Sequence, residues 1–236
     1  MFNPFEPGYF ENPYQQYAAL RESDPVHESP LGVWVLFRYD DVLPLLRNPN
    51  LSVEDQNAAP TARMTQMIET LGDDREQRGS RSLLSLDPPD HTRLRRLVTR
   101  AFTPKVLEGL RPRIQGLVDD ALDKLAGEGE GDLIRQLAFP LPFAVISDML
   151  GMPESDSDRL RGWSHTMVKT LDPIISPEDA KAAMEASDQM NDYVTDVLAW
   201  KRKNPADDLL SALISAEDDG DMLTEQELMD QVVLLY

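Results

Sequence analysis

The chain has 236 residues, with 42 acidic and 23 basic side chains and a formal net charge of −19. A molecule this acidic repels a phosphate backbone, which argues against nucleic acid as a partner. It has no cysteine, so it supplies neither a disulfide nor a thiolate, and no stretch approaches the roughly 20 apolar residues of a membrane span. Its first residues lack the basic and apolar regions of a signal peptide, so we expect a cytoplasmic protein.

The first 50 residues predict a helix, a hairpin and a second helix. Residues 14–23 favour a short helix, and residues 25–38 alternate in polarity and are rich in β-forming side chains. This alternation predicts a small hairpin that turns near residues 30–32. Residues 40–47 predict a helix that stops before an Asn-Pro pair. Residues 52–82 are polar and weakly patterned, and a connection of that length is usually functional or mobile.

A sharply started helix is predicted over residues 87–102. Asp87 suits the N-cap, and Pro88 and Pro89 suit the first turn. At about 100° per residue, one side of this helix collects His91 and Arg95 together with apolar side chains, namely Leu94, Val98, Ala101 and Phe102. An unpaired charge beside an apolar space is costly. We therefore expect Arg95, with His91 one turn before it, to meet an anion at the edge of an apolar space.

The same helix turns three further arginines, Arg93, Arg96 and Arg100, toward its opposite side. Residues 91–113 contain seven Lys and Arg against one acid, Glu108, although the chain as a whole is strongly acidic. A local basic patch of this kind indicates a small anionic ligand or an acidic partner. For the three outward arginines the alternative is that they pair with carboxylates of the chain itself.

The rest of the chain is predicted to be helical. Thr103 and Pro104 form an N-cap and N1 pair that opens a long amphipathic helix, in which Pro112 introduces a kink or a restart. Residues 133–150 are almost wholly apolar and predict a deeply buried helix interrupted by prolines. Further helices are predicted over residues 154–171, 178–203 and 207–216.

The last predicted helix starts at a capping box formed by Thr224 and Glu227. Residues 232–236 are apolar, and no glycine, proline or basic last turn stops the helix. This pattern predicts the beginning of a long core helix that is cut short. The alternative is a C-terminal helix that packs into the core of its own domain.

Residues 86–104, LDPPDHTRLRRLVTRAFTP, resemble the C-helix region of soluble bacterial cytochrome P-450 monooxygenases. The segments GVWVLFRYDDVLPLLRNP, PFAVISDMLGMP and TEQELMDQVVLLY are similar to the front half of that family. The resemblance implies a mainly α fold with a small β-hairpin or sheet near the N-terminus. Residues 1–236 would then be a single incomplete domain, the front half of the fold, truncated at the start of its long central helix.

The resemblance also implies chemistry. The family inserts one oxygen atom of O2 into an apolar organic substrate and uses haem b, whose propionates accept hydrogen bonds from the residues that match His91 and Arg95. An acidic ferredoxin or flavodoxin would dock on Arg93, Arg96 and Arg100. The cysteine ligand of the iron and the oxygen-activating threonine would lie in the missing C-terminal half, so the chain alone is expected to be inactive.

The variable substrate-facing segments of the family correspond to residues around Met64, Met67, Met167, Val168 and Leu171. Core packing is the alternative role for each of these five side chains. His27 is expected at the surface, and no spacing of His, Asp and Glu indicates a metal site.

Two other functions stay open from the sequence. One is a non-enzymatic all-α interaction module that binds an acidic protein through its basic face over residues 93–113. The other is a haem carrier in which His91 ligates the iron.

Overall fold

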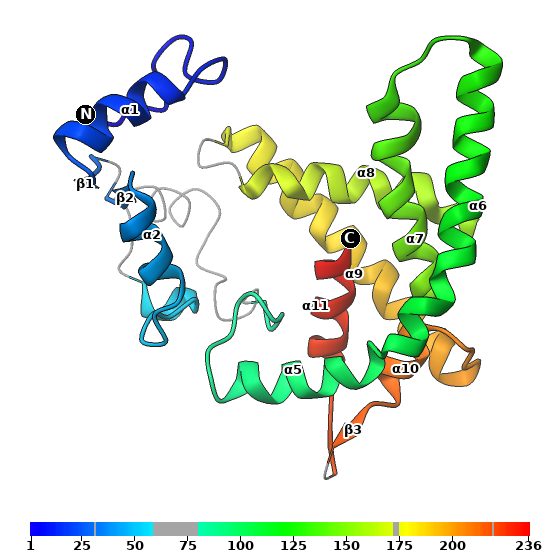
Figure 1. The fold of residues 1–236 in the computed structure, drawn as a ribbon. Helices are drawn as coiled ribbons and strands as arrows, with labels where there is room; N and C mark the ends of the chain where they lie inside the picture. Colours follow the sequence, from blue (N-terminus) through cyan, green and yellow to red (C-terminus); the bar gives the residue numbers. More distant parts are fainter. Residues whose placement is uncertain (31, 59–79, 172–174, 219) are drawn as a thin grey trace. The chain divides into compact units, whose positions relative to one another are not determined.

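The structure, a computed structural model, describes residues 1–236 except residues 31, 59–79, 172–174 and 219 (Figure 1). It forms two compact units, Met1–Gly79 and Ser80–Tyr236. Its described residues are mainly helical, with a two-stranded sheet near the N-terminus, which confirms the predicted fold class. That the whole chain forms a single incomplete domain stays a prediction.

The first unit follows the predicted order of elements: helix α1 (Tyr14–Ser23), strands β1 (Val26–Glu28) and β2 (Trp34–Leu36), helix α2 (Tyr39–Leu46) and a short 3₁₀ turn, η1 (Asp55–Asn57). The two strands are antiparallel, with His27 opposite Val35. Its interior is aromatic: the rings of Phe2, Tyr9, Tyr17 and Phe37 lie about 6 Å apart, in two edge-to-face pairs and two tilted pairs.

The expectation that His27 lies at the surface is wrong. Its side chain is buried in β1, because two polar partners satisfy the ring. Nε2 accepts the Phe2 backbone N–H at 3.2 Å, and Nδ1 lies 2.7 Å from the Asp24 carboxylate. A nitrogen that accepts an N–H carries no proton, so Nδ1 is the donor toward Asp24.

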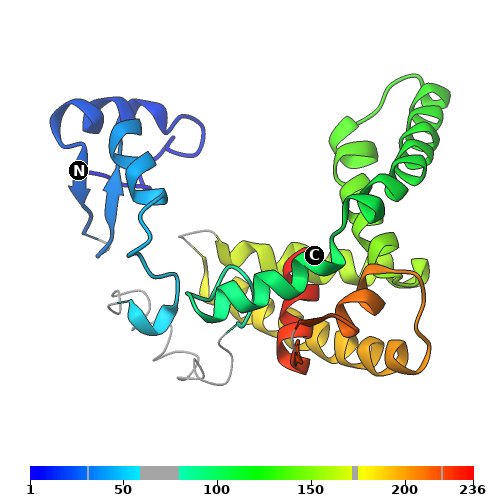
Figure 2. The ribbon, with the colours of Figure 1, turned by 60° about the horizontal axis from the view of Figure 1, so that its bottom comes forward.

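The second unit is a helical assembly around the long helix α9 (Figures 1 and 2). In chain order it contains α5 (Asp90–Ala101), α6 (Pro104–Glu128), the π-helical turn η2 (Ile134–Ala138), α7 (Pro140–Leu150), η3 (Glu154–Asp156), α8 (Ser157–Met167), η4 (Val168–Leu171), α9 (Pro177–Lys203), α10 (Leu209–Ile214), the strands β3 (Glu217–Asp218) and β4 (Asp221–Met222), and α11 (Glu225–Leu235).

One apolar face of α9 organises the core of this unit. Its buried side chains recur every three or four positions, the spacing that keeps residues on one side of a helix. Helices α8, α10 and α11 pack against α9. The fully buried side chains include Leu94, Leu97, Leu150, Leu160, Met190, Val194, Leu198, Leu210, Leu228 and Val232.

The predicted helix starts are confirmed for α6 and α11. The Thr103 hydroxyl accepts the Val106 N–H at 3.2 Å, and Thr224 forms a complete capping box with Glu227. Helix α6 continues through Pro112 to Glu128 without a restart. The short hairpin of β3 and β4 was not predicted, because strands of only two residues are too short to show an alternation of polar and apolar side chains.

The prediction of one deeply buried helix over residues 133–150 is wrong for its first part. Leu133 and Ile134 are more than half exposed, and Phe139 is 48% exposed. Pro140 has no N–H, so it cannot donate a helical hydrogen bond. Just before it, the Phe139 N–H donates to the Ile134 carbonyl at 2.9 Å, which is the i to i−5 spacing of a π-helical turn. Helix α7 starts anew at Pro140, and its burial begins only at Phe143.

No helix in the described part of the chain is both long and apolar enough to span a membrane.

Candidate functional site

Helix α5 carries the two nitrogen-rich side chains that the sequence singles out. The helix begins at Asp90, later than predicted, and Pro89 precedes it without a side-chain cap. The prediction of an Asp87 N-cap is therefore wrong. The backbone carbonyl of Asp87 closes the turn instead, because it accepts the His91 N–H at 2.9 Å. Pro88 and Pro89, which are joined by a cis peptide bond, lie before the helix rather than in its first turn.

The buried stripe of α5 is rotated relative to the predicted one. It consists of Leu94, Leu97, Val98 and Ala101, and the prediction did not include Leu97. At 100° per residue, this stripe leaves Arg95 about 110° from its centre, with Arg93 about 90° away on the other flank. Arg95 is accordingly exposed and His91 half-buried, so the pair borders the apolar face rather than lying within it.

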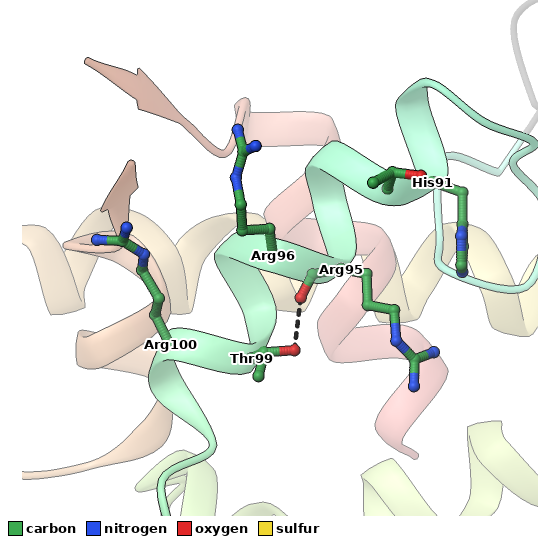
Figure 3. Close-up of a pocket in the computed structure, with 6 residues that line it drawn as sticks. His91, Arg95, Arg96, Thr99 and Arg100 are labelled. Carbon is green, nitrogen blue, oxygen red and sulfur yellow. Dashed lines mark hydrogen bonds between the residues drawn. The ribbon is translucent and has the colours of Figure 1, made fainter. Parts of the chain in front are cut away.

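An open pocket of about 500 Å³ lies along this helix, lined by His91, Thr92, Arg95, Arg96, Thr99 and Arg100 (Figure 3). In the figure, His91 and Arg95 project to one side of the helix, and Arg96 and Arg100 project to the other. Thr99 donates its hydroxyl hydrogen to the Arg95 carbonyl at 2.7 Å. The lining therefore combines hydroxyl groups with cationic groups and contains no carboxylate, which suits an anionic ligand.

Within the part of the chain that the structure describes, the side chains of His91 and Arg95 form no hydrogen bond or ion pair. They lie one helical turn apart. Their donors can therefore bind two oxygens of a single anion, or each can bind an oxygen of a different anion. Chemically, the pair is suited to a carboxylate, because Arg presents a rigid fork of N–H donors and His adds another.

Arg93 joins α5 to elements near the end of the chain. Its guanidinium forms an ion pair with Glu227 in α11 and lies 3.4 Å from Asp221 in β4. Burial opposes its charge, but the two carboxylates outweigh that effect and raise the pKa of Arg93. For Arg93 the alternative of pairing within the chain therefore holds, whereas its role in docking a partner stays a prediction.

The predicted substrate-facing residues divide into two groups. Met167 is half-buried and packs against the core, whereas Val168 is 52% and Leu171 79% exposed. Met64 and Met67 lie outside the described residues. Among the described residues, no group of three or more His, Asp and Glu lies in an arrangement that could hold a metal ion.

Sequence reasoning missed the residues that hold α5 in place. Arg81 lies 2.9 Å from Asp90, and its backbone N–H donates to Asp230 in α11 at 2.5 Å. Gln231 donates its amide hydrogen to the Arg81 carbonyl at 3.3 Å. The two contacts with α11 join residues about 150 positions apart, and no local sequence pattern signals them.

No protein-family model matches the chain. Curated relatives do. The chain is 41% identical over 241 residues to cytochrome P450 107B1 of Saccharopolyspora erythraea, covering 98% of this chain and 56% of that protein. It is 38% identical over 235 residues to the vitamin D(3) 25-hydroxylase of Pseudonocardia autotrophica, covering 98% of this chain and 55% of that one. The chain thus spans about half the length of the curated relatives it matches.

Solved structures give the same result. The cytochrome P450 PksS of Bacillus subtilis superposes with a TM-score of 0.81 at 33% identity, covering 100% of this chain and 57% of that one. Myxobacterial cytochrome P450 CYP267B1, in complex with myristic acid, also gives a TM-score of 0.81, at 36% identity, with 98% and 57% covered. The fold of this chain therefore corresponds to about half of a cytochrome P450.

Proposed function

This chain belongs to the bacterial cytochrome P450 family, and we propose that it forms the N-terminal part of a haem-dependent monooxygenase. The reaction would insert one oxygen atom of O2 into an apolar organic substrate. The observation that carries this proposal is the His91 and Arg95 pair, two donors with no partner among the described residues on the rim of an open pocket.

The residues present fit haem b. Its propionate carboxylates match a histidine and an arginine one turn apart on a helix, and a charge-assisted hydrogen bond is among the stronger polar contacts. His91 and Arg95 would hold these carboxylates at the edge of the apolar stripe of α5. Bound haem would supply the oxygen-activating chemistry, which depends on a thiolate ligand to iron. The sequence contains no cysteine, so the thiolate has to come from outside these 236 residues, and the chain alone is proposed to be inactive.

The substrate would lie against exposed apolar side chains near the end of α8. Val168 and Leu171 have the exposure that such contacts require, whereas Met167 would act mainly by supporting them from the core. An apolar substrate fits this choice, because these positions offer neither charge nor hydrogen-bonding side chains.

Electrons would arrive from an acidic ferredoxin or flavodoxin. Arg96 and Arg100 project from α5 on the side away from His91 and Arg95 (Figure 3). A molecule with a net charge of −19 repels an acidic donor overall, so a basic face of this kind would direct the encounter.

A hemin titration of the 236-residue chain, followed by its Soret absorbance, tests the anchoring pair. Arg95→Ala should weaken hemin binding roughly tenfold or more, because removing a donor to a charged group costs about 1.5–3 kcal/mol. His91→Ala should have a smaller effect. Arg111→Ala is the matched control, since this arginine is exposed on α6 and pairs only with Glu108 among the residues described. Equal affinity in all four proteins would remove the carboxylate assignment.

The spectrum of the reduced CO complex separates the other functions. A histidine-type Soret band that is lost in His91→Ala would favour a haem carrier. An absence of hemin binding in the unsubstituted chain, together with binding of an acidic protein at Arg96 and Arg100, would favour the interaction module. A thiolate-type band requires a cysteine supplied from another polypeptide segment.

A further inference from the structure

The most deeply buried acid of the described chain is Glu227, in the first turn of α11, with 1% of its surface exposed. A buried carboxylate is costly unless every oxygen finds a partner. Its Oε2 accepts the Thr224 N–H at 2.9 Å, which completes the capping box. Its Oε1 meets the guanidinium of Arg93 and lies 3.7 Å from Nε of Arg81. The carboxylate is therefore satisfied from two sides, one of them α5.

Arg93 ties one flank of α5 to the rest of the unit. It lies on α5 between His91 and Arg95 in sequence, but on the opposite flank of the buried stripe from Arg95. Its guanidinium reaches both Glu227 and Asp221. Figure 1 shows the start of α11 beside α5, where this contact forms. On the other flank, His91 and Arg95 form no such tie within the described residues.

The apolar stripe turns one side of α5 toward the core, but it sets the rotation of the helix about its axis only loosely, because hydrophobic contact is non-directional. A charged hydrogen bond between a rigid guanidinium fork and a carboxylate is directional. We propose that the Arg93–Glu227 ion pair fixes the rotation of α5 and so positions His91 and Arg95 for a carboxylate ligand. The pair acts through the helix, so Arg93 and Glu227 are positioning residues, and the inference rests on the proposed function.

Two substitutions break the pair with little change in shape. Arg93→Met removes the charge and keeps a long apolar side chain, and Glu227→Gln removes the charge and keeps an acceptor for the Thr224 N–H. Lys201→Met is the matched control. It breaks another buried ion pair of the same unit, that of Lys201 in α9 with Asp208, which precedes α10 and does not belong to α5.

In a hemin titration, Arg93→Met and Glu227→Gln should each weaken binding about tenfold, as loss of a supporting partner typically does at ligand sites. Arg93→Lys should restore part of the affinity, and Lys201→Met should bind hemin like the unsubstituted chain at a temperature where all variants are folded. The inference is overturned if Arg93→Met binds normally, or if Lys201→Met weakens binding equally, because the effect would then reflect stability alone.

A second measurement needs no haem. The chain has no cysteine, so spin labels at Thr99→Cys in α5 and Asp192→Cys in α9 report one distance only. Arg93→Met should broaden that distance distribution, whereas Lys201→Met should leave it unchanged. An unchanged distribution in Arg93→Met overturns the inference even where hemin binding is too weak to measure.

Arg95→Ala separates this inference from the proposed function. If Arg95→Ala leaves hemin binding intact while Arg93→Met broadens the distribution, the ion pair holds the helix and the carboxylate assignment fails. If Arg95→Ala weakens hemin binding while Arg93→Met changes neither the hemin affinity nor the distance distribution, Arg95 still binds the carboxylate and the positioning role of Arg93 is wrong.

Discussion

Gly151 ends α7 with a φ of +63°, a conformation that side chains other than glycine rarely adopt. A Cβ at this position would overlap Nζ of Lys201 and Oδ2 of Asp208, the two charged groups of a buried ion pair. Gly151→Ala should therefore cost the left-handed backbone strain of about 1–2 kcal/mol and also displace the ion pair. Urea unfolding should give a total loss of roughly 3 kcal/mol or more, because breaking a buried pair is costly in its own right.

Gly129 provides a comparison in which no ion pair is nearby. It ends α6 with a φ of +80°, but no atom lies within 4 Å of where its Cβ would be. Gly129→Ala should show only the backbone strain. If Gly151→Ala costs no more than the backbone strain of about 1–2 kcal/mol, the ion pair can move aside freely and the steric explanation for Gly151 is wrong.

Asp230 offers a test of pH dependence at a single residue. Burial raises its pKa above the ordinary value of 3.8, although the Arg81 N–H and the Gln226 amide donate hydrogen bonds to it. The folded state thus binds this proton more tightly than the unfolded state. Asp230 therefore lowers the free energy of unfolding as pH rises from 3.8 through its raised pKa in the folded state. Asp230→Asn should raise stability at pH 7, and the gain should vanish as pH falls to 3.8.

A control variant isolates burial from net charge. Asp196→Asn removes one negative charge from an exposed position of α9. It should show no comparable rise in the urea midpoint at pH 7. If both variants gain equally, the benefit comes from lowering the overall charge of −19 and not from the buried position of Asp230.

At the scale of elements, α11 depends on its capping box. The Thr224 hydroxyl accepts the Glu227 N–H at 3.2 Å, and Glu227 returns a bond to the Thr224 N–H. Thr224→Ala should lower the free energy of unfolding by about 1 kcal/mol, within the usual range of 0.5–2 for a lost cap. Thr224→Ser keeps the hydroxyl and should recover most of that loss. Urea titrations of the three proteins check this, and equal midpoints for Ala and Ser would refute the capping role.

Elements with local signals could be predicted from the sequence. The caps of α6 and α11 act over three positions, and the hairpin of β1 and β2 is revealed by its own alternation. The exposure of residues 133–139 could not be predicted, because it depends on what packs against them, and the sequence shows only that most of them are apolar. Likewise, the side of α5 that faces the core could be assigned correctly only once Leu97 was seen to be buried.

The candidate site divides in the same way. His91 and Arg95 could be paired from the sequence, since residues four positions apart share one side of any helix. The Arg93–Glu227 ion pair joins residues 134 positions apart, and nothing near Arg93 in the sequence distinguishes it from Arg96 or Arg100. Only the packing of α5 against α11 and β4 shows that Arg93 holds the helix while its neighbours line the pocket.

At the scale of the whole molecule, high net charge and exposed apolar surface oppose each other. A charge of −19 keeps copies of the chain apart. Many large apolar side chains are nevertheless at least 56% exposed, in both units: Phe5, Phe10, Tyr14, Trp34, Tyr39, Leu46, Leu84, Leu133, Ile134, Leu171 and Trp200 among them. Exposed apolar patches promote association, so the state of the chain should depend on how far its charge is screened.

We therefore expect the 236-residue chain to bind a dye specific for hydrophobic surface and to self-associate as salt is added. At about 0.15 M salt the Debye length is near 8 Å, which screens repulsion between copies but leaves apolar contact intact. Light scattering after size-exclusion chromatography, across a salt series at neutral pH, measures this. Ile134→Glu, which places a charge beside Leu133 at the exposed turn η2, should lower dye binding and shift association to higher salt. A monodisperse monomer that melts cooperatively and binds no dye at any salt concentration would mean that these side chains are covered, and the expectation would be wrong.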